Sequence, residues 1–171
     1  MKYWYLLLCF LVFNTSLAQV KWLSIDEAFE LQQKQPKKIF INFFSQHLGV
    51  CKEMDKKVLE HPIISEYINK YFYPVKFDVE EKKSIKYMGK TFSSAEKGKP
   101  HSFTKFMNVS SIPSIIFIDE KNTPITILNG VLKAKELEPY LSLISTDKYL
   151  KINSPSEWSE YQRKFKSKIK E

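Results

Sequence analysis

The chain has few of the residues that mark disordered, fibrous or disulfide-rich proteins. Its 171 residues include only 4 glycines and 8 prolines, which argues against flexible low-complexity linkers and collagen-like segments. No internal repeat is visible, so solenoids and propellers are excluded. Two cysteines are too few for a disulfide scaffold. Hydrophobic residues make up 43% of the chain, enough for an ordered core, and the length fits one domain.

The first 18 residues have the pattern of a secretory signal peptide. Lys2 supplies a positive start, residues 3–13 form an uncharged apolar run, and Ser16 and Ala18 occupy the small-residue positions of a cleavage site. Because the run is shorter than the roughly 20 residues that span a bilayer, we expect cleavage rather than an uncleaved anchor. The sequence therefore predicts an exported protein, periplasmic or secreted.

Removal of the signal peptide changes both the thiol content and the charge. Cleavage after Ala18 leaves 171 − 18 = 153 residues with Cys51 as the only cysteine, so any disulfide it forms must involve another molecule. The processed chain has 26 basic and 19 acidic residues, a net charge of +7. Nucleic-acid binding is not expected despite this charge, because export separates the protein from nucleic acid and no recognition module is visible.

The first part of the processed chain predicts a helix followed by a buried strand. Ser24 and Glu27 form a capping box that begins a helix, and Pro36 ends it. Residues 39–44 (IFINFF) are a nearly continuous apolar run. Such a run is typical of a strand buried on both faces, in a parallel sheet with helices above and below.

The later elements continue this alternation. They are expected to be helices at about 49–60 and from Pro62, a strand at 72–79, a short helix at 100–107, strands at 114–119 and 124–128, and a helix at 133–145. Residues 80–99 are polar, and we expect a surface excursion with a small hairpin around 87–92. The predicted fold class is α/β, with a mixed central sheet flanked by helices and an antiparallel hairpin at its end.

A second capping box, from Ser154 to Glu157, predicts an additional C-terminal helix. One face of that helix would carry Trp158, Tyr161, Phe165 and Ile169. We divide the chain into a signal peptide (1–18), a domain (19–146) and a C-terminal basic, amphipathic helix (147–171). Such helices can contact acidic lipids, but we favour a solvated basic face with the aromatic stripe docked on the domain.

The candidate site lies where the apolar strand passes into the next helix. Cys51 falls in the first turn of that helix, where unpaired N–H groups and the helix dipole favour a thiolate. Lys52 adds a positive charge beside it. The loop before Cys51 consists of His47, Leu48, Gly49 and Val50.

This segment resembles the active segment of the thioredoxin superfamily, in particular exported thioredoxin-like proteins of bacterial envelopes. Their W-C-G-W-C-K-x-M-D corresponds to residues 47–55, HLGVCKEMD. Ser111-Ile112-Pro113-Ser114 also matches, and the element order agrees from about residue 24 to 144. The resemblance implies a thioredoxin-like fold, and a cis-proline at Pro113 that packs against the active-site cysteines and presents backbone to a bound peptide.

The departure from the family pattern concerns the attacking thiol. Leu48 stands where the family has its first cysteine, and His47 and Val50 replace the tryptophans. In the family the first cysteine attacks the substrate and the second releases the mixed disulfide. Cys51 matches only the second, so dithiol turnover is not expected. The resemblance thus implies a thiol-disulfide oxidoreductase lineage with a degenerate CxxC motif.

Three interpretations of Cys51 remain open. It is an inert buried thiol that packs like a small hydrophobic residue, or a monothiol that forms mixed disulfides with a partner. The third is metal binding by His47 and Cys51, with Met54 as a weaker candidate and without a convincing third ligand. We predict no metal and no cofactor.

Other polar and apolar residues near the motif have simpler expected roles. The three histidines are scattered, and we expect surface or capping positions for them. Met54 and Val58 are at helical spacing and are expected in the core. Asp78 could correspond to the carboxylate with which thioredoxins tune proton transfer, but we favour a residue that simply ends its strand.

Two functions follow from this pattern. The first is a polypeptide-binding or chaperone-like module, whose groove beside Ile112 and Pro113 holds an extended client through backbone hydrogen bonds and needs no thiol. The alternative is a monothiol-disulfide exchange protein that uses Cys51 in envelope redox homeostasis. The expected partners are polypeptides or thiol-containing client proteins.

Overall fold

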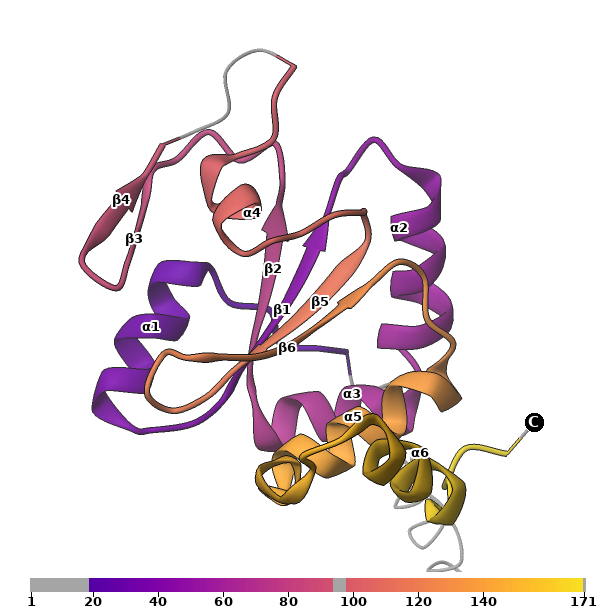
Figure 1. Cartoon of the computed structure of the whole chain (residues 1–171). Helices are drawn as coiled ribbons and strands as arrows, with labels where there is room; N and C mark the ends of the chain where they lie inside the picture. The colour runs from indigo at the N-terminus through magenta and orange to yellow at the C-terminus, as the bar shows by residue number, and fades with distance from the viewer. Residues whose placement is uncertain (1–18, 94–97, 171) are drawn as a thin grey trace, which may run out of the picture.

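The structure is a computed structural model in which residues 19–93 and 98–170 are described (Figure 1). The expected signal peptide, residues 1–18, lies outside this part. No helix in the described ranges is both long and apolar enough to cross a membrane.

A four-stranded mixed sheet forms the centre of the molecule, in the order β2-β1-β5-β6. β1 (Ile39–Phe44) pairs in parallel with β2 (Tyr73–Asp78) and antiparallel with β5 (Ser114–Ile118). β6 (Pro124–Asn129) returns antiparallel to β5 as the predicted hairpin. The predicted mixed sheet is therefore confirmed.

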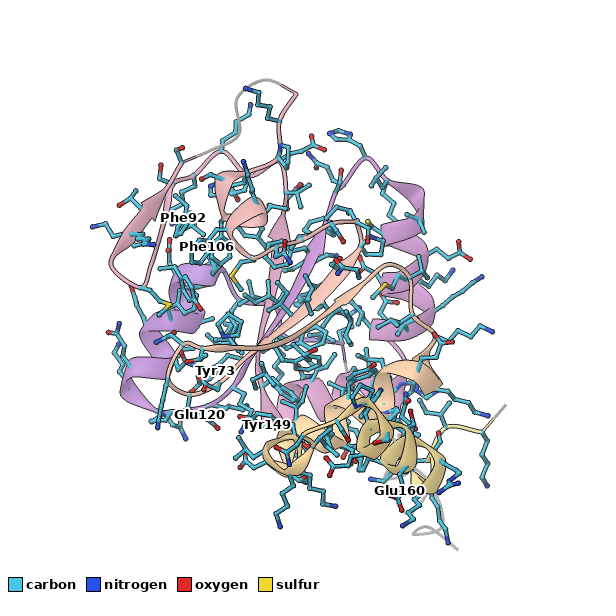
Figure 2. All side chains as sticks on the ribbon, viewed as in Figure 1. Tyr73, Phe92, Phe106, Glu120, Tyr149 and Glu160 are labelled. Carbon is cyan, nitrogen blue, oxygen red and sulfur yellow. The ribbon has the colours of Figure 1, made fainter. Side chains whose placement is uncertain are left out.

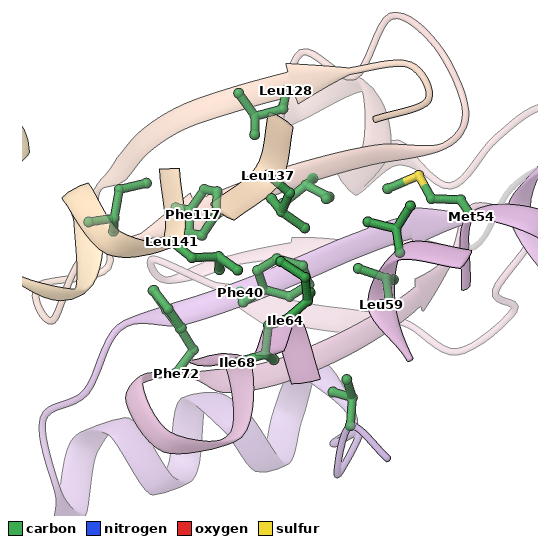
Figure 3. Packing of buried hydrophobic residues seen from close by; sticks show 14 of the residues in the cluster. Phe40, Met54, Leu59, Ile64, Ile68, Phe72, Phe117, Leu128, Leu137 and Leu141 are labelled. Carbon is green, nitrogen blue, oxygen red and sulfur yellow. The ribbon is translucent and has the colours of Figure 1, made fainter. Parts of the chain in front are cut away.

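Helices cover both faces of the sheet because the side chains of β1 alternate between two cores. Phe40 faces the first core, as Figure 3 shows. Three helical elements close this core: the segment α2–η2 (Gly49–Met54 and Asp55–Leu59), α3 (Pro62–Tyr71) and α5 (Ala134–Ser145). Ile39, Ile41 and Phe43 face the other core. This second core is closed by α1 (Ile25–Lys34) and α4 (Ser102–Phe106).

The predicted helix starts are present in the structure. Ser24 Oγ accepts a hydrogen bond from the amide of Glu27 (3.3 Å), and the Glu27 carboxylate accepts one from the amide of Ser24 (2.8 Å). Pro62 occupies the first turn of α3. Met54 and Val58 are buried in the core, as expected.

The predicted hairpin is present, but its segment is more than a surface excursion. β3 (Ile85–Tyr87) pairs antiparallel with β4 (Lys90–Phe92), and the side chains of Ile85, Tyr87 and Phe92 are buried. Phe92 packs on Phe106 with ring centroids 4.8 Å apart (Figure 2). Alternation along the two short strands turns apolar side chains inward, so the hairpin completes the core under α1 and α4.

The C-terminal helix is shorter than the sequence pattern suggested. α6 covers Pro155–Lys164, and residues 148–151 form a separate 3-10 turn. Ile169, expected on the helix face, instead lies in the core beyond the helix end. The cause is a fully buried carboxylate, Glu138 on α5, which accepts hydrogen bonds from Ser167 Oγ and from the amide of Lys168 (2.9 Å). A continuing helix would commit that amide to its own backbone.

A buried lysine ties the C-terminal segment to the start of β1. Lys38 Nζ lies 2.7 Å from Glu120 Oε1 and 2.6 Å from Asp147 Oδ1, and its charge lies 5.9 Å from the ring centre of Tyr149 (Figure 2). Burial opposes the charge, but the hydrogen bonds to both carboxylates outweigh it and raise the pKa of Lys38. The pair of carboxylates therefore stabilises a charge that burial alone would not allow.

Replacing Ile169 tests whether the tail belongs to the core. Ile169→Ala should lower the free energy of unfolding by about 2 kcal/mol, because it removes buried methyl groups and leaves a cavity. Lys170→Ala, one residue further along and exposed, should change it by less than about 0.5 kcal/mol. Urea unfolding followed by tryptophan fluorescence measures both. Equal stability of the two variants would contradict a docked tail.

Protonation of His101 should weaken the fold. This buried ring caps α4: its Nδ1 accepts a hydrogen bond from the amide of Phe103 (3.1 Å), and Nε2–H donates to the carbonyl of Lys83 (3.2 Å). Burial lowers the pKa of His101. Below about pH 6.5 the unfolded chain therefore takes up the proton first, and stability should fall as the pH falls further. His101→Asn, whose side chain can still cap, should lose this part of the slope in urea unfolding between pH 7.5 and 5.5. An unchanged slope would contradict the assignment.

Candidate functional site

Strand pairing brings the two segments of the motif to one end of the sheet. β1 ends at Phe44 and leads through residues 45–48 into α2, while the Ile112–Pro113 loop leads into β5. Phe43 pairs directly with Ser114, so Pro113 lies level with the end of β1. In Figure 1 the first turn of α2 and the loop before β5 both lie at the upper end of the sheet.

A third loop joins them at the same end. Asn129, the last residue of β6, pairs with Ser114; its Oδ1 accepts a hydrogen bond from the amide of Ser110 (3.2 Å) and lies 3.0 Å from Ser114 Oγ. The amide of Gly130 donates to the carbonyl of Pro113 (2.9 Å). The turn at Gly130, where φ is +91°, is thus bound to the proline loop.

The proline loop leaves the backbone N–H and C=O of one residue without a hydrogen-bond partner. The Ile112–Pro113 bond is cis, and Pro113 is buried. The carbonyl of Ser111 accepts a hydrogen bond from Ser114 Oγ (2.6 Å). The amide and carbonyl of Ile112, in contrast, have no hydrogen-bond partner within residues 19–93 and 98–170. These two groups are available to a ligand.

Large apolar side chains are exposed on the loops at this end of the sheet, beside the exposed serines Ser110 and Ser111. Leu48 is 41% exposed and Val50 38%, and Val131, which follows the Gly130 turn, is 56% exposed. Gly49 and Lys52 are also exposed. Sequence reasoning did not single out Val131, because only the pairing of β6 with β5 places it at the site.

Cys51 lies beneath this surface. Only 2% of the residue is exposed, although it sits in the first turn of α2 as predicted. Its amide donates to the carbonyl of Leu48 (3.1 Å), and it is the one cysteine within the described ranges. Reaction with a dissolved disulfide requires an accessible sulfur, so this arrangement does not favour exchange chemistry.

His47 turns toward a carboxylate. Its side chain is 69% exposed, and Nε2 lies 3.4 Å from Glu80 Oε2. Glu80 Oε1 also accepts a hydrogen bond from Ser45 Oγ (2.8 Å). This pair holds the loop to the end of β2. Within the described part of the chain, no three His, Cys, Asp or Glu side chains are grouped so that they could hold a metal ion.

A polar cluster lies behind the loop, on the α2 face of the sheet. Asn42 on β1 is buried, and its Nδ2 donates to Asp55 Oδ1 (3.2 Å). Lys76 on β2, directly opposite Asn42, lies with Nζ 2.5 Å from Asp55 Oδ2. Asp55 follows Cys51 by four residues and begins the π-helical segment, so it lies on the same side of the helix as Cys51.

Sequence reasoning missed this cluster. It considered Asp78 as the nearby carboxylate, but Asp78 ends β2 and accepts a hydrogen bond from the amide of Glu80 (3.0 Å), as the simpler interpretation had it. A signal was available, because Asn42 is the one polar residue in residues 39–44, and a buried amide needs a partner. Asn42 Oδ1 has no hydrogen-bond partner in the described part of the chain.

The other two histidines have the expected capping roles. His61 Nδ1 accepts a hydrogen bond from the amide of Ile63 at the start of α3 (3.3 Å), and His101 caps α4. Neither belongs to the site.

Similar solved structures share the architecture. A thioredoxin-fold protein from Helicobacter pylori is 15% identical, with a TM-score of 0.60 over 75% of this chain and 81% of that one. A putative disulphide-isomerase from Bacteroides thetaiotaomicron is 22% identical, with a TM-score of 0.54 over 80% and 97%. A structure described as DsbH oxidoreductase is 18% identical, with a TM-score of 0.53 over 79% and 87%. At these identities the likeness shows the fold.

The family comparison covers most of the chain. No curated protein matches it. A family model described as a thioredoxin-like domain matches residues 25–145, a range that contains the whole sheet and all three loops of the site. The chain belongs to the thioredoxin-like domain family.

Proposed function

We propose that this protein is an exported polypeptide-binding module of the thioredoxin-like family that lacks the attacking cysteine. One observation carries the proposal: this end of the sheet offers the free backbone N–H and C=O of Ile112 and exposed apolar side chains on the neighbouring loops, while the one thiol in the described part of the chain is buried. The site is therefore equipped for contact with a chain rather than for sulfur exchange.

An extended client segment fits these groups. Its backbone would pair with the amide and carbonyl of Ile112, in the manner of a strand added to a sheet edge. Its apolar side chains would lie against Leu48 and Val131. Such binding depends on main-chain hydrogen bonds and on apolar contact, so the client class is unfolded or extended polypeptide with apolar residues. A client thiol is not required.

The burial of Cys51 argues against the monothiol alternative. A thiolate attacks a disulfide only when the two sulfurs meet, and 2% exposure prevents this without local opening. With Leu48 at the family's first cysteine position, no second thiol would release a mixed disulfide. Thiol-disulfide exchange is therefore not part of the proposed function. Export is part of the proposal and rests on the pattern of residues 1–18.

A negative charge at Leu48 or Val131, the exposed apolar residues of the site, should weaken the binding of an unfolded polypeptide. Leu48→Glu and Val131→Glu should each weaken binding of a reduced, alkylated and fluorescently labelled polypeptide by about tenfold or more, because a carboxylate would have to be desolvated in the contact. Leu150→Glu is the matched control, since Leu150 is 67% exposed on the 3-10 turn, away from the site. Fluorescence anisotropy measures all three.

The same assay separates the proposal from exchange chemistry. Cys51→Ser should keep the affinity of the unchanged protein, because the thiol takes no part in binding. Loss of binding in Cys51→Ser alone, with the fold intact by circular dichroism, would contradict the proposal and indicate mixed-disulfide capture. Equal affinities for the Leu150, Leu48 and Val131 variants would also contradict it.

Leu48→Cys should restore reductase activity if the scaffold is intact. The new thiol would be exposed at the start of α2, three residues before Cys51, so it would attack an insulin disulfide and Cys51 would release the product. Insulin turbidity with dithiothreitol as the terminal reductant measures this. Leu48→Ser should show only the background rate. No rise above background for a folded Leu48→Cys variant would show that the loop geometry is also unsuited to exchange.

A further inference from the structure

Positive charge is concentrated at the C-terminal end of the chain. Residues 148–171 contain seven Lys or Arg and three Glu, so they carry +4 of the net +7 of residues 19–171. Within residues 161–170 there are five basic residues and no acidic one. A helix over this stretch would have spread these charges around its circumference.

The observed path of the tail places its charges differently. Ser167 is bonded to buried Glu138 and Ile169 is in the core, whereas Lys166, Lys168 and Lys170, here called the tail lysines, are all exposed. The tail lysines have no ion-pair partner in the described ranges, in contrast to Lys164, which pairs with Glu160 at 2.6 Å. Their charges are therefore available to an external anion.

The tail lies against α3, where Lys70 adds one positive charge and Glu66 one negative charge. Lys168 Nζ lies 5.1 Å from the ring centre of Tyr67, and Lys70 Nζ lies 5.2 Å from that of Tyr71. Both lysines line one shallow cavity of about 100 Å³. Its other lining residues are Ile63, Glu66, Tyr67 and Tyr71. Tyrosine rings beside ammonium groups are typical of surfaces that meet a membrane interface, where one part of the side chain is apolar and the other is wet.

The N-terminal end of the described chain is hydrogen-bonded to α3. The carbonyl of Gln19 accepts a hydrogen bond from Asn69 Nδ2, and the amide of Lys21 donates to Asn69 Oδ1, each at 2.9 Å. Asn69 precedes Lys70 on α3. The start of the described chain therefore lies beside the part of α3 that carries Lys70 and Tyr71.

We propose that α3 and the tail lysines form a docking surface for anionic phospholipid membranes. The unpaired lysines attract the negative surface, and Tyr67 and Tyr71 lie where the headgroups begin. Figure 1 places α3, α5 and α6 at the lower end of the sheet, opposite the first turn of α2. A docked molecule would therefore hold its polypeptide-binding end away from the bilayer. The proposal does not depend on what that end binds.

Vesicle sedimentation tests this surface on residues 19–171, the processed chain that the sequence predicts. The probes are sucrose-loaded vesicles of phosphatidylcholine alone, and of phosphatidylcholine with an equal share of phosphatidylglycerol. We expect binding to the anionic vesicles only, and its loss at 0.5 M NaCl, where charges are screened within about 4 Å. The combined variant Lys166→Gln, Lys168→Gln and Lys170→Gln should bind on the order of 100-fold more weakly, since each lysine near an anionic surface contributes about fivefold.

A charge-matched variant separates a docking surface from the general effect of net charge. Lys82→Gln, Lys86→Gln and Lys105→Gln remove three exposed lysines from the hairpin side and should leave binding within about twofold. Equal losses in the two variants, equal binding to both vesicle types, or no sedimentation would each overturn the proposal. Binding of poly-glutamate without binding of anionic vesicles would overturn it in favour of an acidic polypeptide partner.

Discussion

The antiparallel pairing of β1 with β5 is the constraint on which the site depends. β1 is buried on both faces, so its position in the sheet cannot shift without moving apolar side chains out of two cores. Its register with β5 sets Phe43 beside Ser114, and from that pairing the turn before α2 and the Ile112–Pro113 loop must meet. The pairing of β5 with β6 adds Val131 to the same end.

At that end of the sheet the exposed groups are backbone and apolar side chains, and not a thiol. Cys51 is buried, and the loop presents Leu48 and Val50 to solvent instead. The carbonyls of Ser111 and Pro113 are used within the loops, whereas the backbone N–H and C=O of Ile112 have no partner in the described part of the chain. The free backbone N–H and C=O of Ile112 and the exposed apolar side chains are the features on which the proposed polypeptide binding rests, and neither requires a thiol.

The path of the C-terminal segment depends on one buried carboxylate, that of Glu138. Glu138 has no solvent contact, and an unpaired carboxylate there would be strongly destabilising. The described donors to it are Ser167 and the backbone of Lys168, so the chain leaves the helical path after Lys164 and lies against the domain. With Ile169 in the core, the tail lysines are exposed, and Lys168 lies beside Tyr67 of α3.

Local signals in the sequence determined the elements, because caps, prolines and apolar periods act within a few residues: Ser24 with Glu27, Pro62, and the run at 39–44 are examples. The sequence also determined that residues 19–171 contain one thiol, and that Leu48 stands at the family's first cysteine position. Tertiary structure alone decided that Cys51 is buried, that Asn42 bonds Asp55, and that the tail leaves its helix for Glu138. Each of these depends on desolvation by residues distant in the chain, which no local pattern encodes.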